Sequence, residues 1–229
     1  MLLRVDGITK SYGSSGFGNL RNVLNNVSFE VSEGESIAIL GPSGSGKTTL
    51  LNIIGSLDYP DAGHVYFNDE KITAYSEKEM ESFRNRQIGY IFQLHHLLPQ
   101  CTLLENVLIP TLGLNDKVEK AARLRRAEEL MKRVGVWDLR EQNPAQLSGG
   151  ECQRTAVIRA MINAPSLLLA DEPTGALDAE NADKLGELLI GINKTDKVAL
   201  VVVTHSVSLA EKMHSVYELR NGRLEKMRS

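Results

Sequence analysis

Short apolar runs of strand length recur along the chain, separated by glycine-rich and polar turns. Residues 198–203 and 167–170 are apolar throughout, and residues 36–40 are apolar after a leading serine. A strand without polar positions is typical of a parallel sheet that is covered on both faces. Residues 27–31 alternate in character, and together with residues 2–5 they predict short antiparallel strands. We therefore expect an α/β fold with a mainly parallel core sheet and an N-terminal antiparallel β subdomain.

The pattern changes to a helical one between residue 94 and about residue 146. Apolar side chains recur there at helical spacing among arginines and glutamates, at Val118, Ala121, Leu124, Ala127, Met131 and Val134. This spacing predicts a helix, which Gly135 would end. We expect one domain over residues 1–229, in which residues 1–93 and 162–229 form the α/β core and residues 94–161 form an inserted helical subdomain.

Turn residues and shorter runs complete the predicted order of elements. Residues 88–92 predict a strand that ends at Gln93, and residues 152–161 predict a helix. Asn221-Gly222 lies between two strand-like runs and predicts a tight hairpin. Residues 13–18 are rich in glycine and serine, which predicts a flexible loop.

Composition narrows the class of protein without specifying a function. The chain has 229 residues, 42% of them apolar and 24% charged, as in an ordinary soluble globular protein. Its net charge of −3 gives no electrostatic reason to expect a nucleic-acid partner. The two cysteines have no metal-site spacing, and the first residues lack the apolar core of a signal peptide. No apolar run reaches the roughly 20 residues that span a bilayer, so we expect a cytoplasmic protein that meets a membrane through a partner.

A glycine-rich segment after residues 36–40 matches the phosphate-loop pattern G-x-x-x-x-G-K-[ST]. It reads Gly41-Pro42-Ser43-Gly44-Ser45-Gly46-Lys47-Thr48, and Thr49 follows at the start of a helical run. Glycines let successive backbone N–H groups turn inward around phosphate oxygens. In this pattern the lysine reaches the β- and γ-phosphates and the threonine hydroxyl binds Mg²⁺. The segment therefore predicts binding of a nucleoside triphosphate.

Two carboxylates, Asp171 and Glu172, directly follow the apolar run at residues 167–170. The carboxyl end of a buried strand is the ligand side of an open parallel sheet. Side chains of adjacent strand residues point to opposite sides, which suits the two carboxylates to different roles. An acidic loop after a strand is common by itself, but the phosphate loop upstream favours a magnesium site at Asp171.

A helix start of an unusual kind is predicted at Ser148-Gly149-Gly150-Glu151, which Leu147 precedes. Ser148 and Glu151 form the S-x-x-E pattern of a capping box. Glycine in a helical turn costs up to about 1 kcal/mol relative to alanine, so a cap alone does not explain Gly149 and Gly150. Glycines there allow close approach to the free N–H groups of the helix start, which favour an anion. We expect these residues to bind a phosphate group.

The phosphate loop, the glycine-rich helix start and the acidic strand end, in this order, resemble those of the ATP-binding subunits of ABC transporters. The resemblance extends from Tyr12 to His205 and implies a transport-coupled ATP hydrolase with ATP and Mg²⁺ as cofactors. It also implies a homodimer, in which residues 147–151 of one copy close over the nucleotide held by the phosphate loop of the other. Integral membrane permease subunits would be further partners, which places the chain on the cytoplasmic face of the inner membrane.

The same resemblance assigns roles to single residues. Glu172 corresponds to the catalytic glutamate that orients and deprotonates the attacking water, and His205 to the histidine that contacts the γ-phosphate. Gln93 matches the glutamine that contacts magnesium and the attacking water, two tasks that an amide allows. Tyr12 matches the aromatic residue that stacks on adenine, and Asp178 matches the loop across the dimer seam.

Two residues depart from the family pattern. Cys152 replaces the usual glutamine or arginine, which puts dimer contacts in doubt, and Ser206 stands where an aspartate is common. Within the family, residues 93–99 and 104–107 are most similar to the ATP-binding subunits of lipoprotein-releasing systems. The broader group includes macrolide and peptide exporters and a cell-division ATPase. The same ATPase motifs serve all of them, and from the resemblance we expect this chain to power the release of lipoproteins toward the outer membrane, with an exporter or a cell-division complex as the alternative.

A different class of function is that of a soluble ABC ATPase acting on DNA or ribosomes. DNA-organising members carry a long coiled coil between the phosphate loop and the glycine-rich helix start, whereas this chain has no sustained heptads there. Ribosome-acting members usually carry two cassettes in one chain. A nucleotide switch without turnover is a third possibility, which the presence of Glu172 and His205 disfavours. For a membrane partner, we expect docking on the helical subdomain near residues 94–99, because Leu94, Leu97 and Leu98 form an apolar sequence beside Gln93 that we expect to be exposed.

Overall fold

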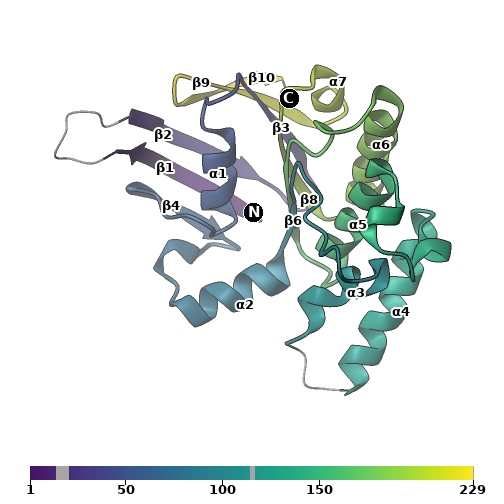
Figure 1. The fold of residues 1–229 in the computed structure, drawn as a ribbon. Helices are drawn as coiled ribbons and strands as arrows, with labels where there is room; N and C mark the ends of the chain where they lie inside the picture. Colours follow the sequence, from purple (N-terminus) through teal and green to yellow (C-terminus); the bar gives the residue numbers. More distant parts are fainter. Residues whose placement is uncertain (14–20, 114–116, 229) are drawn as a thin grey trace.

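The computed structural model describes residues 1–13, 21–113 and 117–228 (Figure 1). The predicted flexible loop at residues 13–18 lies, apart from Gly13, outside this part of the chain.

Two β-sheets form the framework, one antiparallel and one mainly parallel (Figure 1). The antiparallel sheet has the order β2-β1-β4-β5 and consists of β1 (Leu3–Tyr12), β2 (Arg21–Val31), β4 (Ala62–Phe67) and β5 (Glu70–Lys71). The larger sheet has the order β10-β9-β3-β8-β7-β6 and consists of β3 (Ser36–Leu40), β6 (Ile88–Ile91), β7 (Leu167–Asp171), β8 (Ala199–Thr204), β9 (Ser215–Arg220) and β10 (Arg223–Arg228). Its strands β9, β3, β8, β7 and β6 are parallel, and β10 pairs antiparallel with β9. The predicted parallel core and N-terminal antiparallel sheet are confirmed.

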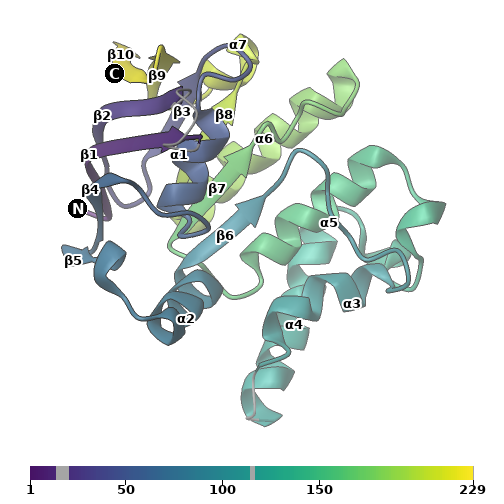
Figure 2. The same ribbon diagram turned by 60° about the vertical axis from the view of Figure 1, so that its left-hand side comes forward.

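Helices cover both faces of the larger sheet (Figures 1 and 2). On one face, α1 (Lys47–Ile54) packs between the two sheets, and α2 (Glu77–Gln87) leads into β6. The remaining helices are α3 (Leu103–Leu108), α4 (Lys117–Arg133), α5 (Gly149–Met161), α6 (Ala179–Asp196) and α7 (Val207–Ala210). Short 3-10 turns lie at Ile72–Ala74, Ile109–Thr111, Trp137–Leu139 and Pro144–Gln146. In the described ranges, none of the helices is long and apolar enough to cross a membrane.

The apolar strand β8 separates two hydrophobic cores. Ala199, Val201 and Val203 belong to the core that contains α1 and the antiparallel sheet. Leu200 and Val202 point the other way, into the core that contains α3 to α6. All five side chains are fully buried, as expected for a strand covered on both faces.

The helices α3, α4 and α5 gather at one end of the molecule (Figure 2). The predicted helix at residues 118–134 is confirmed as α4, and the one at residues 152–161 as part of α5. Leu103, Met131 and Ala156 share one core with Leu168 and Leu200 of the large sheet. Because this core is continuous, the division of the chain near residues 94 and 162 into an α/β core and a helical subdomain stays a prediction.

Candidate functional site

The phosphate loop lies between β3 and α1, at the carboxyl end of the larger sheet. Gly46 is the N-cap residue of α1 and has a φ of 103°, which a side chain would strain. A Cβ atom there would also lie 2.9 Å from the Val23 carbonyl oxygen. The loop therefore needs a glycine at this position both for its backbone conformation and for its packing against β2.

Lys47 folds back over its own loop. Its Nζ donates to the carbonyl oxygens of Gly41 at 2.7 Å and Pro42 at 3.2 Å. The same ammonium lies 3.5 Å from Oε1 of Glu172. Its side chain is only 8% exposed, so this positive charge is held inside the loop against a carboxylate from the end of β7.

The Thr48 hydroxyl and the Asp171 carboxylate lie together beside the loop. Thr48 Oγ1 donates to Asp171 Oδ1 at 3.2 Å, although the two residues are far apart in the sequence. Burial raises the pKa of Asp171, and the neighbouring Glu172 charge adds to the effect. A hydroxyl and a carboxylate are hard oxygen donors, which fit Mg²⁺, and a cation there would favour the ionised form of Asp171.

Glu172 turns toward β8 and away from Asp171. Its φ of 45° lies in the left-handed region, and its amide donates to the Val203 carbonyl oxygen at 2.9 Å. Its Oε2 accepts a hydrogen bond of 3.0 Å from the His205 amide and lies 2.9 Å from His205 Nδ1. The Glu172 side chain is 15% exposed and that of His205 is 70% exposed. The two adjacent carboxylates therefore have different partners, as expected, but the cause is the left-handed turn at Glu172 after the end of β7 and not the alternation along a strand.

Gln93 follows the end of β6 and is exposed. Its amide reaches the turn after Glu172, since a Cβ atom added to Gly175 would lie 3.1 Å from Gln93 Nε2. Gly175 donates its own amide to the Glu172 carbonyl oxygen at 2.9 Å. The structure thus brings Gln93 to the same edge of the sheet as the two carboxylates.

Tyr12 lies at the end of β1, beside the phosphate loop. Its hydroxyl donates to Asp58 Oδ2 at 2.6 Å, and 46% of the residue is exposed. It lines a cavity of about 240 Å³ together with Arg21, Val23, Gly44, Gly46, Lys47, Thr48 and Thr49. Sequence reasoning missed Arg21, whose guanidinium donates to the Gly44 carbonyl oxygen at 3.0 Å. No local motif marks that arginine, because β2 meets the loop only in the folded chain.

The glycine-rich helix start forms the N-terminus of α5. Ser148 Oγ accepts from the Glu151 amide at 3.3 Å, and Glu151 Oε2 accepts from the Ser148 amide at 2.8 Å. The predicted capping box is therefore confirmed. Ser148 and Gly149 are exposed, whereas Gly150 is buried. None of the three lines the cavity beside the phosphate loop.

The need for glycine differs between the two positions of this helix start. A Cβ atom on Gly150 would lie 2.7 Å from Asn181 Oδ1, so a side chain here would force the Asn181 amide to move. A Cβ atom on Gly149 would meet only Leu177, at 3.8 Å, which is an ordinary contact. Asp178 caps α6 and holds Asn181 in place, since its Oδ2 accepts from Asn181 Nδ2 at 2.7 Å. Asp178 therefore lies behind the helix start rather than at the phosphate loop.

Three further expectations are settled by burial and capping. Cys152 is 2% exposed, and its thiol faces the Pro144 carbonyl oxygen inside the chain. A direct contact of this thiol with a second copy is therefore not expected. Ser206 caps α7 by accepting from the Leu209 amide at 3.3 Å, a task that an aspartate would perform equally. Leu94 and Leu98 are exposed, but the expectation that Leu97 is exposed is wrong, because it is buried in the core.

A glycine-rich loop between β3 and α1, with a hydroxyl from the start of α1 and two carboxylates at the end of β7, defines a nucleotide-binding protein of the P-loop class. A family model described as "ABC transporter" matches residues 24–175. The chain belongs to this ABC transporter family, and it is an ABC-type ATPase that binds ATP.

Known relatives match the chain over nearly its whole length. It is 41% identical over 225 residues to the lipoprotein-releasing system ATP-binding protein LolD of Idiomarina loihiensis, covering 98% of this chain and 97% of that protein. Two dimeric structures of the ATP-binding cassette MJ0796, one of them bound to ADP and Pi, are 37% identical with a TM-score of 0.88 and full coverage of both chains. CbiO1 of Clostridium perfringens, part of the ABC transporter complex cbiONQ, shares the fold with a TM-score of 0.85, 24% identity and coverage of 98% and 86%.

Proposed function

We propose that two copies of this chain form a head-to-tail dimer that holds two ATP–Mg²⁺ between them. In each site, Lys47 and the loop amides would hold the phosphates, and Thr48, Asp171 and Gln93 would face the metal. Tyr12 would stack on the adenine. Ser148, Gly149 and Gly150 of the other copy would close over the γ-phosphate. The exposed helix start of α5, which has no part in the cavity beside its own phosphate loop, supports this sharing, and so do the dimeric MJ0796 structures.

Hydrolysis would depend on Glu172 as the base. Its carboxylate, held by the His205 amide, would orient a water molecule in line with the γ-phosphorus and accept its proton. Lys47, the loop amides and the N-terminus of α5 would stabilise the charge that develops on the phosphate. Bound Mg²⁺ would neutralise phosphate charge beside Thr48 and Asp171. The observation that carries this proposal is the convergence of Lys47 on Glu172 and of Thr48 on Asp171 at one edge of the sheet.

The Glu172→Gln variant tests this assignment. It keeps the shape of the side chain but removes the base, so ATP binding should persist while turnover falls by about a hundredfold or more. The ATP-bound dimer should then accumulate, which size exclusion with and without ATP would detect. Turnover of the Glu172→Gln variant at the native rate would show that Glu172 is not the base.

We further propose that the chain powers the release of lipoproteins from the inner membrane toward the outer membrane. It would do so on the cytoplasmic face of the inner membrane, coupled to integral membrane permease subunits. Two observations support this: the similarity of residues 93–99 and 104–107 to that group, and the 41% identity to a lipoprotein-releasing ATP-binding protein. The net charge of −3 gives no support to a nucleic-acid partner.

Depletion of the protein in the bacterium that produces it distinguishes lipoprotein release from the exporter and cell-division alternatives. Outer-membrane lipoproteins should accumulate in the inner membrane, as measured by membrane fractionation, before sensitivity to drugs or peptides changes. Normal lipoprotein sorting combined with lost macrolide or peptide resistance would assign the chain to an exporter instead. A division defect with normal sorting would assign it to the cell-division complex.

A further inference from the structure

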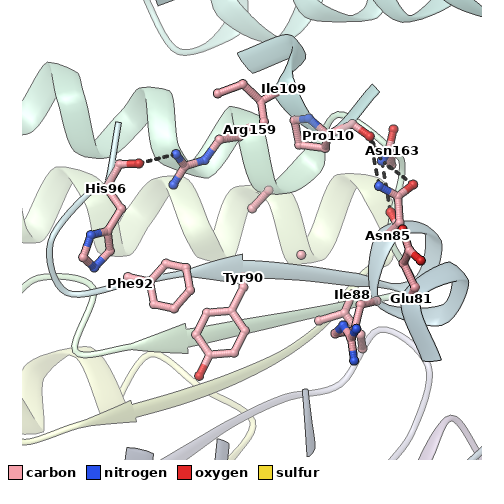
Figure 3. A pocket seen from close by; sticks show the side chains of 13 residues that line it. Glu81, Asn85, Ile88, Tyr90, Phe92, His96, Ile109, Pro110, Arg159 and Asn163 are labelled. Atoms are coloured by element: carbon pink, nitrogen blue, oxygen red, sulfur yellow. Dashed lines mark hydrogen bonds between the residues drawn. The ribbon is translucent and has the colours of Figure 1, made fainter. Parts of the chain in front are cut away.

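The loop that carries Gln93 is fastened along its backbone to α5. Gln153 Nε2 donates to the Phe92 carbonyl oxygen at 2.9 Å, on the N-terminal side of Gln93. Arg159, further along the helix, donates to the carbonyl oxygen of His96 at 2.7 Å, as Figure 3 shows, and to that of His95, also at 2.7 Å. Gln93 therefore lies between two attachment points that both come from α5.

The two attachments differ in how deeply they are buried. Gln153 is only 3% exposed, and the Arg159 guanidinium is partly buried beside a cavity of about 500 Å³ that Phe92 and His96 also line. His96 has a φ of 47°, and this turn of the backbone lets one guanidinium reach two consecutive carbonyl groups. The bonds to Phe92 and His95 are part-buried, and hydrogen bonds from a charged guanidinium are stronger than neutral ones, which helps to hold this stretch of backbone in place.

The far end of the loop is anchored to a different helix. Asn106 of α3 is fully buried; its Oδ1 accepts from the Leu98 amide at 2.7 Å, and its Nδ2 donates to the Leu98 carbonyl oxygen at 3.1 Å. Movement of the loop away from α5 is thus limited from both sides. The course of the backbone between Phe92 and His95 therefore determines where the Gln93 side chain lies.

We propose that Gln153 and Arg159 are positioning residues that fix Gln93 against the turn after Glu172, where its Nε2 lies near Gly175. The helix that begins with Ser148 thereby also sets the geometry of the metal side of its own chain's site. This inference rests on the proposed function only for the role that it gives to Gln93. Neither Gln153 nor Arg159 lines the cavity beside the phosphate loop, so their removal should change turnover and leave the affinity for ATP unchanged.

The test uses the purified full-length chain with Arg159→Met, which keeps the length of the side chain but removes both donors. A displacement of about 1 Å at a reacting group can cost up to a hundredfold in rate, so kcat should fall about ten- to a hundredfold. Arg159→Lys, which keeps the charge on a single donor nitrogen, should have a kcat between those of the native protein and Arg159→Met. Gln153→Glu replaces the donor by an acceptor, and its kcat should resemble that of Arg159→Met.

Arg126→Met is the matched control. Arg126 also donates twice to a backbone carbonyl, that of Met161 at 3.2 and 3.3 Å, but it lies on α4 and contacts the end of α5 rather than the Gln93 loop. Its loss should lower the melting temperature to a similar degree without changing kcat. Equal losses of kcat in the Arg126 and Arg159 variants would show that both effects come from general destabilisation, and would overturn the proposal.

A double-mutant cycle with Gln93→Ala shows whether Arg159 acts through Gln93. In the Gln93→Ala background, Arg159→Met should cause no further loss of kcat, and an undiminished loss would refute the coupling. Amide hydrogen exchange gives an independent readout, because residues 93–98 should lose protection in Arg159→Met but not in Arg126→Met. Native turnover of Gln93→Ala would refute the proposed role of Gln93, and unchanged exchange in Arg159→Met would refute the attachment itself.

Discussion

At the residue scale, the side chains proposed to hold ATP already contact one another. Lys47 is held by two loop carbonyls and by Glu172, while Thr48 is bonded to Asp171. Such contacts fix the side chains near the positions that a phosphate and a cation require, so less conformational entropy is lost on binding. The same contacts must be exchanged for contacts with the ligand when it enters.

Lys47→Ala should weaken binding of the nucleotide itself. Hydrogen bonds to charged groups are worth about 1.5–3 kcal/mol, so the affinity should fall roughly ten- to a hundredfold. Titration with a fluorescent ATP analogue measures the change. Lys132→Ala provides the control, since Lys132 pairs with Glu128 on the surface of α4 and its loss should leave the affinity unchanged. Native affinity of the Lys47 variant would contradict the assignment.

At the scale of elements, the N-termini of α5 and α6 are packed against each other. Asn181 of α6 occupies the space that a side chain at Gly150 would need, and Asp178 holds Asn181 in that position. The segment proposed to meet the partner's nucleotide is therefore supported from behind by the segment proposed to lie at the dimer seam. A shift of one helix start requires a shift of the other, because interiors are close-packed.

Gly150→Ala and Gly149→Ala should consequently behave differently in stability. The first forces a methyl group against Asn181 and should destabilise the chain by about 1–3 kcal/mol. The second has open space and should stabilise the helix by up to about 1 kcal/mol. Chemical denaturation of the nucleotide-free protein measures both. Equal effects of the two substitutions would contradict the packing described here.

Combining Gly150→Ala with Asn181→Ala separates packing from nucleotide binding. The double variant should regain most of the stability, because the obstructing amide is gone. ATP-dependent dimerisation should stay impaired in Gly149→Ala and in the double variant, since a methyl group would still block the free amides from the phosphate. Native dimerisation of both variants would count against a role of this helix start in the dimer.

How far the sequence predicts these elements depends on how local the signal is. The apolar run of β8 and the phosphate-loop motif are contiguous in the chain, and both lie where the pattern predicts. The sequence pattern does not indicate α6, because Gly186 lowers the helix propensity of this segment. The structure explains the glycine, since a Cβ atom added at Gly186 would lie 3.2 Å from the Leu209 side chain. It also missed α2, a largely polar helix with only Met80 and Phe83 buried, although the capping box at Ser76 was readable.

The parts of the site that the sequence could not reveal are those that join distant segments. Asn181 meets Gly150, and Arg21 meets Gly44, only after the chain has folded. Similarly, the run of leucines at the loop after Gln93 does not tell which of them is buried. The backbone turn at His96, with its φ of 47°, directs Leu97 inward and leaves Leu98 outside.

At the scale of the whole molecule, a second feature lies beside the Gln93 loop. A cavity of about 500 Å³ is bounded by α2, β6, α5 and the turn at Ile109–Thr111, with Tyr90, Phe92 and Pro110 among its lining residues (Figure 3). The exposed side chains of Leu94 and Leu98 follow Phe92 in the same loop. This combination of a recess and exposed leucines fits a partner, and we propose that the membrane subunit docks there.

Crosslinking from this loop tests the docking surface. Leu94→Cys, in a Cys101→Ser background, should capture an integral membrane protein in cells treated with a thiol crosslinker, because Leu94 is 61% exposed. Leu124→Cys offers a matched control: Leu124 is also exposed, at 47%, but lies on α4. Recovery of soluble proteins alone from Leu94→Cys, or the same membrane protein from both positions, would contradict docking at this loop.

The ion pair between Lys47 and Glu172 has a consequence for the timing of catalysis. One ammonium group serves two anions in turn: the carboxylate before ATP arrives and the phosphate afterwards. If the phosphate takes Lys47 as its partner, as proposed, the Glu172 carboxylate loses its cationic contact and becomes free to accept a hydrogen bond from the attacking water. In the empty site the lysine occupies the carboxylate, so arrival of the substrate would itself release the group that is proposed to act on the water.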